Sequence, residues 1–475
     1  MDKKTAAKGV AWNMAFAVPA KILFPIVGIF IMRFVGPKDA GIYAVIAAIF
    51  GVTELLREGG LGATYLADTK LDAARRAHYA TVSIVSALVF GAILLFGRHI
   101  IAGMFGRPVF ADALIWAAIC VAAGGVVTVP AVQMQRDLKF RELGTADFFA
   151  TLASYTVAIA MAIGGYGIVA LITQLVVRVV LFTLLILRFG GLIKPSFAYE
   201  SWRILASASS NLTANLAVYV YTTFDYFLVS KWLGDRANGA YFAAFNVASK
   251  PVDLITSPVN KTIMVAYARA AGDVERQADL WTRTIGGLLL LTLPIYGLLG
   301  FFGPVIMHLL YSSDFAIGGP VLSILAIYLG LRAFGSAAGS ALVATGRPRI
   351  HTWAWVAGYV VALTCLAFEY KNPSLNGVVW CLTGGIATVY LFLLLATAKL
   401  MPPTRTQLMV LGRRALGGVA TIAVMGACRF LPLVDWGQLA VAASLGAPVH
   451  LFLMSKILGG HPFSISGIKE MIKKI

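Results

Sequence analysis

Charged side chains inside apolar segments are the residues of this chain best suited to chemistry. The segment FNVASKPVDLITSPVNK, residues 245–261, carries Lys250, Asp253 and Lys261 in apolar surroundings, with two prolines among them. On insertion scales each charge at the bilayer centre costs roughly 2.5–3.5 kcal/mol, so the three charges require partners, water or a ligand. Each proline frees a backbone carbonyl and permits a bend, which suits a helix that lines a cavity.

Other apolar segments also carry basic residues, namely Lys21, Arg57, Arg178 and Arg332. Asp253 is the only acid near the middle of an expected span, and Asp225 lies toward the outer third of its span. The central zone of the expected membrane region is therefore net cationic. Lys and Arg side chains in a low dielectric bind anionic groups through charge-assisted hydrogen bonds.

Polar residues share helix faces with these charges. At 100° per residue, one stripe is formed by Asn246, Lys250, Asp253, Ser257, Asn260 and Lys261. Further stripes are formed by Asn211, Asn215, Thr222 and Asp225, and by Tyr328, Arg332, Ser336 and Ser340. Because a polar stripe in a membrane helix faces water, a ligand or a polar partner, these faces are expected to line a site.

Salt bridges are the alternative explanation for the same charges. Glu54, Arg57 and Glu58 stand at i, i+3 and i+4, so they are expected to pair with each other near the interface. Lys250 and Asp253 are close enough in sequence to form a structural pair as well. Lys21, Arg178 and Arg332 have no acid three or four residues away, which favours a cationic, water-filled cavity over private salt bridges.

Composition identifies the elements that must position these residues. The chain has 475 residues, of which 59% are hydrophobic and 13% charged, and its mean hydropathy of +0.83 is too high for a soluble protein. Apolar runs near the roughly 20 residues needed to cross a bilayer recur from end to end. We expect an all-α polytopic membrane protein with fourteen spans, at 10–36, 40–58, 79–103, 110–132, 146–164, 167–188, 205–233, 238–264, 284–310, 318–344, 352–369, 376–398, 413–431 and 438–457.

The net charge of +18 follows membrane topology rather than a nucleic-acid surface, because the basic residues lie in short loops. With the N-terminus inside, 25 Lys and Arg fall on the inner side and eight on the outer side. The positive-inside rule then places both termini in the cytoplasm. The tail 459–475 is either a basic amphipathic helix on the anionic inner leaflet or a solvated end.

The two halves of the chain repeat each other. FVGPKDAGIYA at 34–44 matches WLGDRANGAYF at 232–242, with Gly36, Gly41 and Tyr43 aligned to Gly234, Gly239 and Tyr241 at an offset of 198. We therefore expect an N-lobe of six spans at 1–200, a C-lobe of six spans at 201–400, two additional spans at 401–458 and the cytoplasmic tail. Parallel repeats place a binding cavity between two bundles that rock against each other.

Signatures of enzymes and cofactor sites are absent from the sequence. The six histidines show no metal-ligand spacing, the four cysteines lie in apolar runs without a CxxC pair, and there is no phosphate-binding loop. The chain is accordingly expected not to be an enzyme, to hold no cofactor or metal, and not to drive transport with ATP by itself.

The duplicated halves, FVGPKDAGIYAV after the first span and TFDYFLVSKWLGDRANGAYFAA around the seventh, resemble the Wzx-type polysaccharide transporters of the MOP superfamily. The resemblance covers essentially the whole chain. It implies a MATE-like fold of two six-helix lobes in the bacterial cytoplasmic membrane. It also implies transport of undecaprenyl-diphosphate-linked oligosaccharides, repeat units of O-antigen or exopolysaccharide, from the inner to the outer face.

That resemblance gives the candidate residues their expected roles. Substrate would be bound by Lys21, Arg57, Arg178, Lys250, Lys261 and Arg332, with Asn246 and Tyr328 contacting sugars. Asp225 and Asp253 are candidates for coupling to protons or sodium ions. Expected partners are the lipid-linked oligosaccharide, the bilayer and the polymerase of the same pathway, and no nucleic acid.

Two other transporters of the same superfamily remain alternatives. A peptidoglycan-precursor (lipid II) flippase shares the fourteen spans and an anionic lipid-linked substrate. A multidrug or cation antiporter needs acids at mid-depth to capture a cation, whereas mid-depth is mostly basic here.

Overall fold

The computed structural model describes residues 23–196, 203–204, 212–270 and 272–458, with only the backbone given for Lys261 and part of α9. No strand occurs in these residues, and eleven of their helices are long and apolar enough to cross a membrane. Each of the fourteen expected spans coincides with a helical segment, in the part that is described. The all-α polytopic fold class is thus confirmed.

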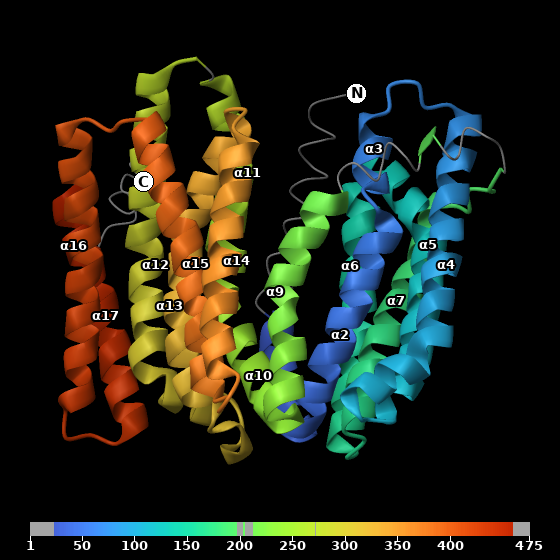
Figure 1. The fold of residues 1–475 in the computed structure, drawn as a ribbon, viewed down its shortest axis with the longest axis horizontal. Helices are drawn as coiled ribbons and strands as arrows, with labels where there is room; N and C mark the ends of the chain where they lie inside the picture. Colours follow the sequence, from blue (N-terminus) through green and yellow to red (C-terminus); the bar gives the residue numbers. More distant parts are fainter. Residues whose placement is uncertain (1–22, 197–202, 205–211, 271, 459–475) are drawn as a thin grey trace. The chain divides into compact units, whose positions relative to one another are not determined.

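Contacts divide the chain into two compact units, Met1–Gly239 and Ala240–Ile475. Unit 1 contains a helix at Leu23–Val35, α2 (Pro37–Glu58), α3 (Leu61–Ala67), α4 (Ala73–Phe105), α5 (Val109–Arg136), α6 (Phe140–Ile163), α7 (Ile168–Gly190) and α9 (Leu212–Leu233). Helix α5 contacts α2, α4 and α7, α6 pairs with α7, and α9 runs along α2 (Figure 1).

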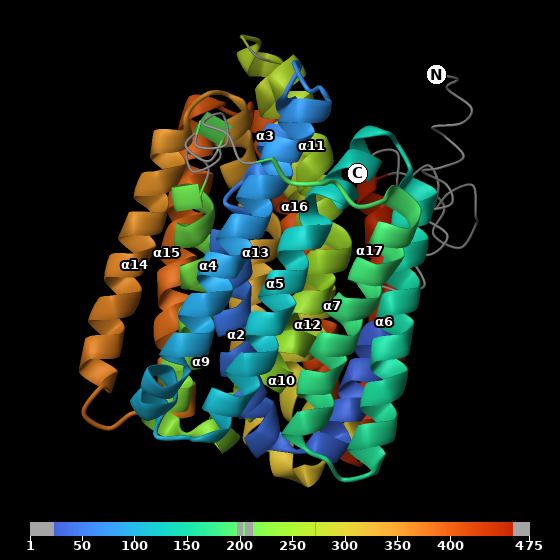
Figure 2. The same ribbon diagram turned by 90° about the vertical axis from the view of Figure 1, so that its right-hand side faces the viewer.

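Unit 2 contains most of α10 (Asp235–Pro251), η1 (Val252–Thr256), α11 (Ser257–Arg269), α12 (Val274–Leu310), η2 (Ser313–Phe315), α13 (Gly318–Ala344), α14 (Pro348–Glu369), α15 (Leu375–Leu400), α16 (Arg405–Ala427), η3 (Cys428–Phe430) and α17 (Asp435–Leu458). Helix α13 packs between α12 and α15, and α14 packs on α15 (Figure 2). Helices α16 and α17 pack against α12.

The boundary between the units falls inside α10, whereas the sequence repeat alone places it at residue 200. The reason is that α9 and the first turn of α10 pack on helices of unit 1.

The helices of the two units pack in the same pattern, as the sequence repeat requires. The contacts of α4, α5, α6 and α7 with one another recur among α12, α13, α14 and α15. The equivalent helices α4 and α12 also begin with the same kind of N-terminal cap. Asp72 caps α4 by accepting a hydrogen bond from the Arg75 amide (2.7 Å), and Asp273 caps α12 by accepting one from the Arg276 amide (2.9 Å).

The repeated glycine motif packs against its own copy within unit 1. A Cβ on Gly41 would lie 1.9 Å from the carbonyl oxygen of Asp235, and a Cβ on Gly239 would lie 1.7 Å from that of Pro37. Pro37 and Asp235 are equivalent at the same offset of 198, so the contact between α2 and α10 is locally two-fold symmetric. Only glycine permits this approach of the two backbones. The Asn238 side-chain amide also donates to the carbonyl of Gly41 (2.8 Å).

A polar network around Asp68 holds the end of unit 1 where α3 meets α4. The Asp68 carboxylate accepts hydrogen bonds from the Lys70 amide (2.9 Å), the Arg75 guanidinium (2.9 Å) and the Tyr79 hydroxyl (3.2 Å). Arg136 of α5 donates to the Asp68 carbonyl (2.7 Å). Three segments of unit 1 are therefore joined at Asp68, through its carboxylate and its backbone carbonyl.

This network predicts a pH-dependent stability. Burial acts to raise the pKa of Asp68, but hydrogen bonds from the Lys70 amide and Arg75 outweigh it and hold that pKa below the ordinary 3.8. A depressed pKa in the folded state contributes stability that is complete above the unfolded pKa and lost as pH falls through the folded one. Asp68→Asn is expected to lower the thermal unfolding midpoint in detergent at neutral pH. The difference from the unmodified protein should shrink below about pH 4; a difference unchanged at lower pH contradicts the account.

Candidate functional site

Two helices are interrupted at equivalent positions of the repeat. Helix α2 ends at Glu58 and is followed by Gly59 and Gly60, both with positive φ (53° and 82°), before α3 begins. At the offset of 198, Glu58 corresponds to Thr256, the last residue of the π-helical segment η1. Paired interruptions of this kind mark binding sites in transporters built from repeats, because interrupted helices expose backbone groups within the membrane.

The interruption in unit 2 follows from its prolines. Pro251 and Pro258 lack the amide hydrogens that an α-helix needs, and between them the amide of Ser257 bonds the carbonyl of Val252 five residues back. Asp253 lies in this π-helical segment and is exposed. Such π-segments occur frequently at functional sites, so the stretch singled out by its charges is also a stretch of irregular helix.

Lys250, Asp253 and Arg332 form no ion pair with the described residues of unit 2. No salt bridge within 4.0 Å joins any of them to an opposite charge among the residues that the structure describes. Lys250 and Asp253 are therefore not the structural pair that their spacing allowed. Lys250 and Arg332 are half-buried, and Asp253 is an electrostatic neighbour of Arg332.

Tyrosines surround Arg332. Its electrostatic neighbours are Tyr390 of α15, Tyr328 of α13, Asp253 of η1 and Tyr296 of α12. Tyr328 is buried and its ring lies edge-on to Phe245, with centroids 6.4 Å apart. Arg332 thus has three tyrosines and one carboxylate as electrostatic neighbours, and it forms no ion pair within 4.0 Å among the described residues.

The polar stripe of the eighth span has unsatisfied groups. Asn260 donates to the hydroxyl of Ser336 on α13 (2.9 Å), while its own Oδ1 and the hydroxyl of the buried Thr256 lack hydrogen-bond partners among the described residues. Asn246 instead donates to the carbonyl of Phe242 in its own helix (3.0 Å). Unmet buried polar atoms are costly and call for a bound group.

In unit 1, Arg57 is paired as its spacing predicted. Its guanidinium bonds both carboxylate oxygens of Glu54 (3.1 and 2.8 Å) and the hydroxyl of Thr128 on α5 (2.9 Å). The side chain is 5% exposed. An arginine satisfied in this way is suited to holding α2 against α5.

Arg178 also has a carboxylate partner, on a different helix. It contacts Asp147 of α6 at 3.2 Å, and both side chains are more than half exposed. An exposed pair of this kind is worth about 0–1 kcal/mol and opens easily. Sequence spacing missed the pair because the two residues are 31 positions apart on separate helices.

The structure describes only some of the remaining candidate residues. Asp225 is buried in α9 and accepts a hydrogen bond from the amide of Tyr226 (2.9 Å). Lys21 lies outside the described residues, as does the tail 459–475. The backbone of Lys261 lies in α11, and Asn215 and Thr222 lie in α9.

Comparison with solved structures identifies the fold. The chain superposes on lipid II flippase MurJ in an inward closed conformation with a TM-score of 0.74, at 15% identity over 94% of this chain and 99% of that one. An inward-facing multidrug resistance MATE transporter of the MOP superfamily gives 0.59, at 16% identity over 83% and 96% of the two chains. The fold is therefore that of MOP-superfamily transporters.

The chain belongs to the polysaccharide biosynthesis protein family, whose model matches residues 30–317. It is 23% identical to the succinoglycan biosynthesis transport protein ExoT of Rhizobium meliloti, over 82% of this chain and 80% of that protein. It is 26% identical to the lipopolysaccharide biosynthesis protein WzxC of Escherichia coli, over 45% and 44% of the two chains. The resemblance noted in the sequence is confirmed.

Proposed function

We propose that this chain is a flippase that moves undecaprenyl-diphosphate-linked oligosaccharide repeat units across the bacterial cytoplasmic membrane. The proposal rests on two half-buried cations of unit 2, Lys250 and Arg332. Neither of them forms an ion pair within 4.0 Å with an acid among the described residues. A diphosphate needs such uncompensated donors, because a cation already neutralised by a carboxylate has less attraction left for it. The names of the relatives support the same class of cargo.

Other polar groups complete the proposed site. The unmet oxygens of Thr256 and Asn260 are suited to sugar hydroxyls. Asp253 is exposed and is an electrostatic neighbour of Arg332. It would neutralise Arg332 while no substrate is bound, or it would bind and release a proton or sodium ion during transport. Lys21, Lys261, Asn246 and Tyr328 remain proposed contacts. Arg178 would join them after releasing Asp147, and Asp225 remains a coupling candidate.

Transport would proceed by alternating access, with both termini in the cytoplasm. The paired interruptions of α2 and of α10–η1–α11 support this mechanism, because interrupted helices bend at little cost.

Deleting the gene tests the proposal. The deletion strain is expected to lose its surface polysaccharide and to accumulate the lipid-linked repeat unit, and the plasmid-borne gene should restore both. Normal polysaccharide in the deletion strain, with no accumulated intermediate, would contradict the proposal.

A lipid II flippase is the second candidate, favoured by the superposition on MurJ across nearly the whole of both chains. Expression in a strain depleted of its peptidoglycan-precursor flippase separates the two. Rescue of growth would support the second candidate, and continued lysis would support the first. Resistance to cationic dyes on expression would instead indicate a cation antiporter.

A further inference from the structure

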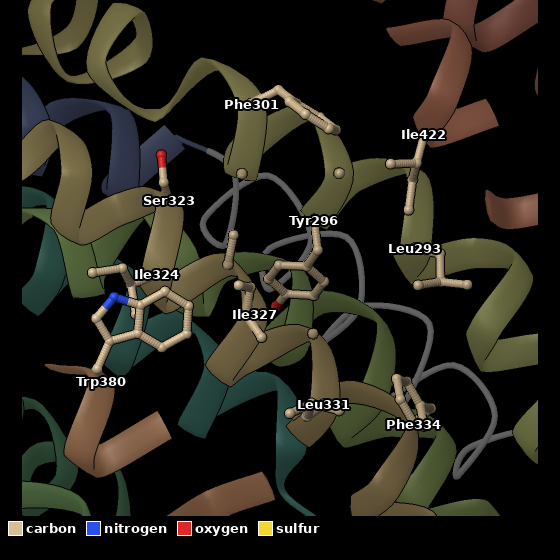
Figure 3. A pocket seen from close by; sticks show the side chains of 14 residues that line it. Leu293, Tyr296, Phe301, Ser323, Ile324, Ile327, Leu331, Phe334, Trp380 and Ile422 are labelled. Carbon is tan, nitrogen blue, oxygen red and sulfur yellow. The ribbon is translucent and has the colours of Figure 1, made fainter. Parts of the chain in front are cut away.

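Unit 2 contains an apolar pocket of about 480 Å³ between α12, α13, α15 and α16 (Figure 3). Tyr296 and Phe301 of α12 and Phe334 of α13 form part of its wall, with Trp380 of α15 and Ile422 of α16 on opposite sides. No mid-span cation discussed above lines it. The pocket therefore holds none of these cations, although Tyr296 of its wall is an electrostatic neighbour of Arg332.

Glycines and a kink create this space. Gly300 lines the pocket, and a Cβ built there would meet only the Ala326 methyl group, at 3.9 Å. Helix α12 is non-helical at Phe302 (φ −112°, ψ 16°), and Pro304 lacks the amide that would bond the Gly300 carbonyl. The kink interrupts the regular course of α12 beside the pocket, and the bare backbone at Gly300 leaves the gap unfilled.

The chemistry of the lining fits a hydrocarbon chain. The hydroxyl of Tyr296 donates to the carbonyl of Ala248 (3.1 Å), so only its ring faces the pocket. The hydroxyl of Ser323 and the indole nitrogen of Trp380 are the other polar side-chain atoms of the lining residues. A sugar requires several converging polar groups, and a hydrocarbon requires none. Phe301, Ile327 and Trp380 are 46%, 47% and 52% exposed on membrane-spanning helices. These exposed side chains form the mouth of the pocket, on helices long and apolar enough to cross a membrane.

We propose that this pocket holds a segment of the polyprenyl chain of the carrier lipid, an inference that rests on the proposed function. The methyl-branched, unsaturated chain is wider than a saturated acyl chain, and its flat alkene groups stack on the rings of Tyr296, Phe301, Phe334 and Trp380. Because Tyr296 lines the pocket and is an electrostatic neighbour of Arg332, a chain held here would keep the diphosphate near Arg332.

Filling the pocket tests the proposal. The probe is undecaprenyl phosphate in nanodiscs of phosphatidylethanolamine and phosphatidylglycerol, and native mass spectrometry measures the lipid retained by the full-length protein. Gly300→Leu is expected to reduce retained undecaprenyl phosphate about tenfold or more, equivalent to 1.4 kcal/mol. Gly300→Ala, which has room, should retain it within about twofold.

Two further variants separate pocket filling from misfolding. Gly412→Leu adds the same side chain at an exposed glycine of α16 that has no neighbour within 4 Å, and it should bind normally. Ile327→Trp narrows the exposed mouth without crowding the core, and it should lose undecaprenyl phosphate as Gly300→Leu does.

The outcomes distinguish this proposal from the proposed function. If Gly300→Leu and Ile327→Trp retain as much undecaprenyl phosphate as the unmodified protein, the pocket proposal is wrong and the proposed function is unaffected. Loss of phospholipid without loss of undecaprenyl phosphate would also overturn the pocket proposal, because the occupant would then be an acyl chain. Absence of undecaprenyl phosphate from the unmodified protein would overturn both proposals.

Discussion

Replacing Arg332 with alanine is expected to abolish surface polysaccharide while the protein remains in the membrane at near-normal levels. A hydrogen bond to a charged group contributes about 1.5–3 kcal/mol, so its loss should weaken diphosphate binding by roughly 10- to 150-fold. Folding should be little affected, because Arg332 forms no ion pair among the described residues whose removal would strand a carboxylate. Lys250→Ala is expected to behave in the same way.

The measurement is surface polysaccharide in the deletion strain that carries each variant, normalised to membrane protein level. Arg283→Ala is the matched control, since Arg283 is an exposed arginine of unit 2 that pairs with Asp279 on its own helix (2.9 Å). That control should leave output within about twofold. Arg332→Lys keeps the positive charge but loses the planar guanidinium group that can donate two parallel hydrogen bonds to a phosphate. Surface polysaccharide is therefore expected to be partly restored. Normal output from both Arg332→Ala and Lys250→Ala would show that these residues are not needed for transport.

The second large effect is expected at the crossing of α2 and α10. Gly239→Ala places a methyl group 1.7 Å from the carbonyl oxygen of Pro37, and Gly41→Ala places one 1.9 Å from that of Asp235. Since backbone atoms block both positions, the helices must separate. Overpacking of this kind costs about 3 kcal/mol. Each variant should lower the thermal midpoint in detergent by roughly 5–10 °C.

Gly103→Ala provides the control for this crossing. Gly103 lies in α4 with no neighbouring atom within 4 Å of a built Cβ, so alanine should fit and slightly favour the helix. Thermal midpoints of Gly239→Ala and Gly41→Ala equal to that of Gly103→Ala would contradict the close approach of the two backbones.

Hydropathy and the spacing of residues were sufficient to predict those structural features that depend on residues close together in the sequence. Apolar runs predicted the helices, and the i, i+3 spacing predicted the pair of Glu54 and Arg57. The two prolines predicted an irregular eighth span, though not its π-helical form between Val252 and Thr256. These features follow from the backbone and from side chains on one helix.

Contacts between residues on different helices could not be predicted from hydropathy or from spacing along the sequence. Arg178 meets Asp147 on a neighbouring helix, and the tyrosines near Arg332 come from three helices. The repeat identified Gly41 and Gly239 as equivalent, but not that they touch, because a sequence offset does not state how helices cross. The pocket at Gly300 likewise depends on a kink in α12.

We propose above that this chain carries a lipid-linked oligosaccharide from the inner to the outer leaflet, with Lys250 and Arg332 binding the diphosphate. The most direct measurement is the fraction of undecaprenyl-diphosphate-linked oligosaccharide that an impermeant sugar-modifying enzyme reaches from outside in spheroplasts lacking the polymerase. We expect this fraction to be high with the unmodified chain, and low both without the chain and with Arg332→Ala. An equally high fraction in spheroplasts without the chain would contradict the account.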